Sequence, residues 1–136
     1  MRYLILILLP LISFSQSDVP DKYWLDDGNF EEVINGNSAF GDDDQETVVI
    51  EFWAKFNEVN CFAEWEDIEN AKYYRVDIAK APETKKKYKV RMAPTIIIFK
   101  GGIKETAFKA GLDLELPTDL EEIQETINEI NNANKF

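Results

Sequence analysis

The chain contains one thiol that could act as a nucleophile, that of Cys61, and the sequence has no second cysteine. A dithiol/disulfide cycle within one chain needs two thiols, so the protein cannot run such a cycle alone. Histidine is also absent, which excludes catalysis by a histidine and removes a common zinc ligand.

The first residues have the composition of a secretory signal. A short basic start precedes the apolar run 4–12, which is too short to span a bilayer comfortably, and small residues follow. We therefore predict a signal peptide over residues 1–16 and a single mature domain over residues 17–136. A short membrane anchor and a buried helix are the alternatives. The signal places the mature chain outside the cytoplasm, periplasmic or secreted, and not embedded in a membrane.

Acidic residues outnumber basic ones by 26 to 15, a net charge of −11, and loss of Arg2 with the signal leaves 14 against 26, or −12. Such a surface repels nucleic acid and anionic membranes, so we expect neither as a partner. The run Asp42-Asp43-Asp44 invites comparison with calcium sites, but its spacing does not match an EF-hand loop, and solvated charge is the preferred interpretation. We predict no metal site and no cofactor.

Hydrophobic patterns predict the elements that must position these residues. The runs 47–53 and 95–100 are apolar and rich in β-branched residues, which is typical of strands buried on both faces. Asn57 is a good N-cap and predicts a helix from there to about residue 70. Further strands are predicted at 23–25, 73–78 and 103–110, and further helices at 28–34, 81–89 and 118–130.

Three local signals support these boundaries. Asp27 is expected to cap the helix that ends at residue 34, and Thr118 with Glu121 has the spacing of a capping box. Gly101-Gly102 predicts a hairpin between two strands. Strands separated by helices imply parallel crossovers, and the hairpin adds an antiparallel edge. The expected architecture is therefore a single α/β domain with a mixed sheet.

Three short motifs carry a resemblance to a known family. Phe52-Trp53-Ala54 ends the first buried strand, Ala93-Pro94-Thr95 opens the second, and Phe99-Lys100-Gly101-Gly102 forms the hairpin. The chain resembles the thioredoxin-like superfamily, as a divergent member that lacks the Cys-x-x-Cys motif. The resemblance implies the thioredoxin fold, a central mixed sheet flanked by helices, with a short helix after the degenerate active-site turn. It also implies a cis peptide bond at Ala93-Pro94.

The resemblance also implies roles for residues at matching positions. The four places of the missing motif hold Asn57, Glu58, Val59 and Asn60. Glu51 matches the buried acid that assists proton transfer in active members, so the resemblance makes it a candidate proton acceptor whose pKa burial would raise. The alternative is that Glu51 is a tolerated polar residue without a role, because its cysteine partner is missing. A shallow groove for an extended peptide is implied, formed by Trp53, Phe56, Met92, Ala93 and Pro94.

Cys61 can be placed in two ways. If the helix begins one residue late, Cys61 takes the position of the second, resolving cysteine; otherwise it falls just past the motif. In either register a helix would gather Cys61 with Phe62, Trp65 and Ile68 on one apolar side. This pattern favours a buried structural thiol, because burial raises a thiol pKa and blocks access.

Three functions follow from these features, in order of preference. The first is an exported module that binds a peptide or protein client and has lost dithiol redox chemistry, so that the chain is not an active dithiol oxidoreductase. The alternative is a monothiol thiol-disulfide oxidoreductase or isomerase-like protein of cell redox homeostasis that forms mixed disulfides through Cys61. The third is a dimer bridged through Cys61 in place of a monomer.

Overall fold

The computed structural model describes residues 19–35 and 46–133. The predicted signal peptide at residues 1–16 and the acidic run at residues 42–44 lie outside the described residues. Of the helices in the described part, none is long and apolar enough to cross a membrane.

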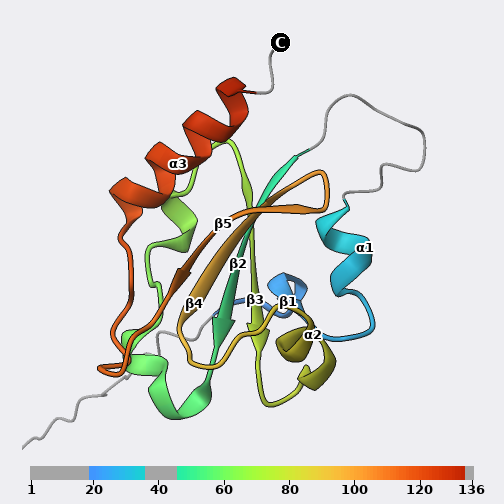
Figure 1. The fold of residues 1–136 in the computed structure, drawn as a ribbon, viewed down its shortest axis with the longest axis vertical. Coiled ribbons are helices and arrows are strands. Elements are labelled where there is room, and N and C mark those ends of the chain that lie inside the picture. The colour runs from blue at the N-terminus through green and yellow to red at the C-terminus, as the bar shows by residue number, and fades with distance from the viewer. Residues whose placement is uncertain (1–18, 36–45, 134–136) are drawn as a thin grey trace, which may run out of the picture.

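A five-stranded mixed sheet forms the centre of the molecule (Figure 1). The spatial order is β1-β3-β2-β4-β5; β1, β3 and β2 are parallel, and β4 is antiparallel to both β2 and β5. The strands are β1 (Trp24–Leu25), β2 (Thr47–Trp53), β3 (Lys72–Asp77), β4 (Thr95–Lys100) and β5 (Ile103–Lys109). Each bound lies within one residue of its prediction, and the expected mixed sheet is confirmed.

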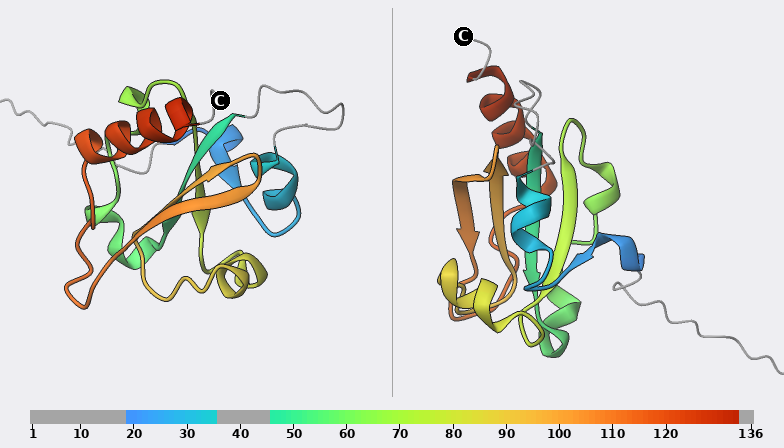
Figure 2. Two further views of the ribbon diagram at one scale, coloured as in Figure 1. Left: turned by 45° about the horizontal axis from the view of Figure 1, so that its top comes forward. Right: turned by 90° about the vertical axis from the view of Figure 1, so that its right-hand side faces the viewer.

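Side chains of the central strand β2 alternate between two hydrophobic cores, because successive residues of a strand point to opposite faces. Val48, Ile50 and Phe52 belong to one core. This core is covered by α1 (Phe30–Ile34) and by the residues that flank α2 (Pro82–Lys87). Val49 belongs to the other core, which α3 (Leu120–Ala133) covers. Figure 2 shows α3 on one side of the sheet and α1 with α2 on the other.

The predicted helix from Asn57 to about residue 70 is wrong. The segment holds two short 3-10 helices, η3 (Lys55–Asn60) and η4 (Trp65–Asp67). Asn57 has a non-helical backbone, with φ −125° and ψ 27°, and its side chain bonds to distant carbonyls instead of capping a helix. The turn after β2 is therefore held by long-range contacts and not by a regular helix.

The predicted cap of α1 is also wrong, because Asp27 serves α2. Its carboxylate accepts hydrogen bonds from the backbone N–H groups of Glu83 (3.1 Å) and Thr84 (2.8 Å) and from the Thr84 hydroxyl (2.7 Å). These N–H groups lie in the first turn of α2, which begins at Pro82, and such groups lack partners within their own helix. Asp27 thus joins the turn after β1 to the helix that follows β3.

The predicted capping box of α3 is displaced by one residue. Asp119, and not Thr118, accepts the hydrogen bond from a first-turn backbone N–H, that of Glu122, at 2.8 Å. The Thr118 hydroxyl donates instead to the Glu122 carboxylate at 2.6 Å. The helix itself buries Ile123 and Ile127 as its spacing predicted.

Candidate functional site

The turn after β2 and the segment before β4 meet at one end of the sheet. Phe52 of β2 pairs with Thr95 of β4, so η3 continues from the same edge at which Met92-Ala93-Pro94 arrives. The Ala93-Pro94 peptide bond is cis, the isomer that the resemblance implied. The fold thus brings together the degenerate motif and the proline segment, as the sequence predicted.

Two amide side chains of the degenerate motif lock this end of the sheet. The Asn57 side-chain nitrogen donates to the carbonyl oxygens of Ala93 and Leu114, both at 2.8 Å. The Asn60 side-chain nitrogen donates to the Asn57 side-chain oxygen, also at 2.8 Å. Both hydrogens of the Asn57 amide are therefore used. We call Asn57 and Asn60 the amide clamp, because they tie η3 to the proline segment and to the β5–α3 connection.

The residues around the clamp differ sharply in exposure. Phe56 is 76% exposed and Val59 is 73% exposed. Glu58 and Met92 are half-buried, whereas Ala93 and Pro94 are buried. The turn therefore holds its polar amides inward and presents apolar side chains to solvent, the reverse of the usual surface arrangement.

Trp53, another predicted groove residue, lies behind this surface. It is buried and makes an edge-to-face contact with Trp24, with ring centroids 5.0 Å apart. Its indole nitrogen has no hydrogen-bond partner among the described residues. Trp53 therefore supports the turn through packing and presents little surface of its own.

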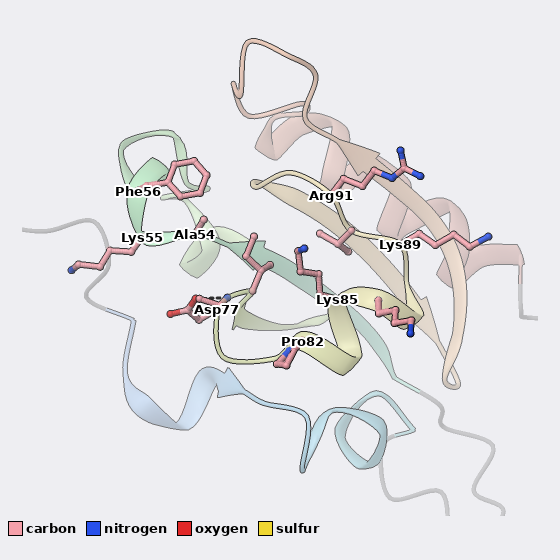
Figure 3. A pocket seen from close by; sticks show the side chains of 12 residues that line it. Ala54, Lys55, Phe56, Asp77, Pro82, Lys85, Lys89 and Arg91 are labelled. Carbon is pink, nitrogen blue, oxygen red and sulfur yellow. Dashed lines mark hydrogen bonds between the residues drawn. The ribbon is translucent and has the colours of Figure 1, made fainter.

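A cavity of about 1080 Å³ lies beside Phe56, between η3 and α2. We call it the α2 groove. Its apolar lining includes Ala54, Phe56, Ile78 and Val90. Basic side chains surround this lining, namely Lys55, Lys85, Lys86, Lys89 and Arg91. Figure 3 shows Phe56 and Lys55 on one side of the groove, Lys89 and Arg91 on the other, and Lys85 between them.

The predicted peptide groove coincides with the α2 groove only at Phe56. Met92 lines a smaller cavity of about 360 Å³, and Ala93 and Pro94 line neither of the two. Lys89 and Arg91 line both. The hollow surface at this end of the sheet thus extends toward α2 further than the resemblance implied.

Glu51 belongs to a buried polar network on the face of β2 that also carries Val49. One carboxylate oxygen accepts hydrogen bonds from the Tyr73 hydroxyl (2.6 Å) and from the Arg75 guanidinium (3.1 Å), and the second accepts from the backbone N–H of Phe62 (2.9 Å). The same guanidinium donates to the Tyr73 hydroxyl (2.8 Å) and to the Phe62 carbonyl (3.1 Å). Glu51 is therefore the centre of a connected network and not an isolated buried acid.

Burial governs the titration of this network. It raises the pKa of Glu51 above its ordinary value, although the charge of Arg75 and three hydrogen-bond partners oppose the rise. It also holds the pKa of Tyr73 well above its usual range. Burial alone would lower the pKa of Arg75, but the charge of Glu51 and the contact with Tyr73 more than offset it. The expected direction for Glu51 is thus found, and its use as a proton acceptor stays a prediction.

Cys61 lies just outside η3, in an extended conformation with φ −70° and ψ 165°. The predicted apolar helical side that would carry it is wrong, since no helix includes it. The thiol is nevertheless buried, at 8% exposed. Burial raises its pKa, and the charge of Arg75 offsets this only in part. The neutral thiol is therefore favoured, which weakens it as a nucleophile.

Two features of the site were not predicted from the sequence. Arg75 is fully buried and stands directly opposite Glu51 in the β2–β3 register. A signal was available, because Arg75 occupies an inward position of an alternating strand. The basic lining of the α2 groove was not predicted either, because Lys55 is distant in sequence from Lys85, and only the fold brings them together.

Comparison with known proteins supports the assignment of the fold. A family model described as thioredoxin matches residues 22–129. The thioredoxin of Schistosoma mansoni has a TM-score of 0.60 and 22% identity, covering 78% of this chain and 92% of that chain. A mutant thioredoxin of Halobacterium salinarum has a TM-score of 0.58 and 15% identity, with coverage of 78% and 87%.

A thioredoxin of Malassezia sympodialis has a TM-score of 0.55 and 21% identity, with coverage of 78% and 87%. At such identities these structures show the shared fold. A search of curated protein sequences finds no match. The family model spans most of the chain, and the sequence contains a single cysteine. The chain therefore belongs to the thioredoxin family, as a member without the Cys-x-x-Cys motif.

Proposed function

We propose that this chain is an exported thioredoxin-fold module that binds a peptide or protein client and performs no dithiol redox chemistry. The observation that carries the proposal is the exposed ring of Phe56, which stands beside the α2 groove while the amide clamp fixes the turn that presents it. A rigid apolar surface suits recognition, because little conformational freedom is lost on binding. Export rests on the composition of the first residues.

The monothiol alternative depends on Cys61. The positive charge of Arg75 acts in its favour, since it stabilises a thiolate. Burial acts against it, because it raises the thiol pKa and limits access. A dimer bridged through Cys61 meets the same obstacle. We therefore place binding before thiol chemistry.

Binding to cysteine-free peptides tests the proposal directly. An array of such peptides, probed with the purified chain in the presence of a reductant, removes any contribution from mixed disulfides. We expect binding that is weakened at least tenfold by Phe56→Ser. Ile103→Ser is the matched control, because Ile103 is also exposed. Ile103 begins β5 and pairs with Lys100, at the end of β4 that is remote from the proline segment. Absence of binding, or equal loss in both variants, would refute the proposal.

Alkylation of the native protein separates the thiol-dependent alternatives. If Cys61 is structural, iodoacetamide should label it at an appreciable rate only after denaturation, and Cys61→Ala should bind peptides as the wild type does. Rapid native labelling with a depressed apparent pKa would instead support the monothiol function. An insulin-reduction assay should show no turnover, because the chain supplies one thiol.

A further inference from the structure

Basic side chains outnumber acidic ones around the α2 groove, although the protein as a whole is acidic. Among the described residues, five basic side chains line the groove, and Asp77 is the one acidic residue that does so. The Asp77 carboxylate is engaged locally, since it accepts a hydrogen bond from the backbone N–H of Ala79 at 2.9 Å. A chain with a net charge of −11 therefore carries a positive groove.

The five basic side chains are available to a ligand. In the described part of the chain, ion pairs form at Lys72, Arg75 and Lys87, and none involves the five residues of the groove. Four of the five are exposed and Lys85 is half-buried. Within the residues that the structure describes, the cations of the groove therefore lack carboxylate partners, and their positive charge is available to attract an anionic ligand.

One of these residues occupies an unfavourable backbone position. Lys89 has φ +57° and directly follows Tyr88, the C-cap residue of α2. The backbone N–H of Val90 donates to the Lys85 carbonyl (2.9 Å), and that of Lys89 donates to the Lys86 carbonyl (3.1 Å). This is the hydrogen-bond pattern of a Schellman motif, whose left-handed position glycine normally fills. A lysine there adds a cation to the groove at the expense of stability.

We propose that the α2 groove binds a short acidic peptide segment in which apolar and acidic residues alternate. This inference rests on the proposed function and specifies its ligand. In an extended peptide, successive side chains point in opposite directions. One set can pack on the exposed Phe56 and the half-buried Ile78. The carboxylates of the other set then meet Lys85, Lys86 and Lys89. Apolar contact then provides affinity, and charge complementarity selects the partner.

The same charge distribution argues against larger anions. A nucleic acid or an anionic membrane would extend beyond the groove and meet the acidic remainder of the surface, which would repel it. The charged side chains of a short peptide segment can lie within reach of the groove alone. The net negative charge of the chain outside the groove thus favours a short peptide over a polyanion or a lipid surface.

Fluorescence anisotropy with three matched peptides tests the inference. The peptides share the same leucine positions and carry glutamate, glutamine or lysine between them. We expect the glutamate peptide to bind about tenfold more tightly than the glutamine peptide at low salt, since several exposed charge pairs of modest strength combine. The difference should shrink at about 1 M salt, where the screening length falls to about 3 Å.

The triple variant Lys85→Gln, Lys86→Gln and Lys89→Gln should remove the preference for the glutamate peptide over the glutamine peptide. Lys104→Gln is the control for loss of charge, because Lys104 is exposed on β5 away from the groove. It should leave the preference unchanged.

Each other outcome has a defined meaning. If the glutamine peptide binds as tightly as the glutamate peptide, the proposed binding function stands and the acidic specificity is overturned. If no peptide binds, the proposed function fails with it. Tighter binding of a single-stranded oligonucleotide or of phosphatidylglycerol vesicles would overturn the choice of a peptide. Self-association at low salt would assign the groove to an acidic segment of a second copy.

Discussion

Replacing Lys89 by glycine should make the protein more stable while weakening acidic-peptide binding. Lys89 has φ +57° at the end of α2, in a region where a Cβ atom approaches the following carbonyl oxygen. Glycine has no Cβ and adopts this conformation without penalty. The two hydrogen bonds of the cap join backbone atoms only, so the substitution keeps them.

The expected gain is the difference between two terms. The left-handed conformation costs a non-glycine residue about 1–2 kcal/mol. Glycine also makes the unfolded chain more flexible, which removes about 0.4–1 kcal/mol. The net increase in the free energy of unfolding is therefore about 0.5–1 kcal/mol, or a rise in Tm of a few degrees for a domain of this size. Exposure of the lysine side chain means that little packing is lost.

Urea unfolding followed by tryptophan fluorescence measures the change. Lys86→Gly provides the control, because Lys86 lies within α2, where glycine should cost about 1 kcal/mol relative to a good helix former. The two variants remove the same charge from the same groove, so both should weaken binding of the glutamate peptide. They should move stability in opposite directions.

A less stable Lys89→Gly variant would refute the assignment of strain at this position. A stable variant that binds the glutamate peptide as tightly as the wild type would refute the role of Lys89 in the groove. The stability measurement and the binding measurement thus test separate statements about one residue.

Three further substitutions test other parts of the structure. Asn57→Ala removes three hydrogen bonds of a buried amide, so the free energy of unfolding measured in urea should fall by about 2–3 kcal/mol. Asn132→Ala, at the exposed end of α3, should leave it unchanged. Burial raises the pKa of Glu51 in the folded state above its ordinary 4.5, so the folded state binds the proton more tightly than the unfolded chain does. The stability of the wild type relative to Glu51→Gln should therefore fall as the pH rises above about 4.5. An increase in this relative stability would contradict the direction of the pKa shift. The pKa of Asp27 is lowered in the folded state, chiefly by the hydrogen bond from the Thr84 side chain. Its contribution to the free energy of unfolding is therefore present at neutral pH and lost as the pH falls below about 3.8. In Asp27→Asn, the free energy of unfolding should depend less on pH in this acidic range.

The elements that the sequence predicted well are those set by local pattern. The strands β2 and β4 are continuous apolar runs and are buried along almost their whole length, which only a central position in a covered sheet allows. The hairpin follows from Gly101-Gly102, both of which have positive φ. In these segments each residue's preference agrees with its neighbours, so the pattern alone was sufficient.

Two of the wrong predictions, those for Asn57 and Asp27, share a physical cause, which is a side chain whose partner is remote in sequence. Asn57 was assigned as a helix cap because its type suits one, but Ala93 and Leu114, 36 and 57 positions away, receive its hydrogen bonds. Asp27 was assigned to the adjacent helix and serves α2, 57 positions away. Local preference identifies a residue that can cap, and only tertiary structure decides which backbone groups it reaches.

The amide clamp also explains why a single substitution at residue 57 would not create a working cysteine at that position of the motif. A thiol at residue 57 could not donate two hydrogen bonds, so the carbonyl groups of Ala93 and Leu114 would lose their partner and the turn its anchor. The buried Cys61 lies after η3, in an extended conformation and with a raised pKa. In this chain Asn57 and Asn60 instead stabilise the turn that holds Phe56. Under the proposed function, a client is therefore selected by the groove beside that ring and by its cations, and not by thiol exchange.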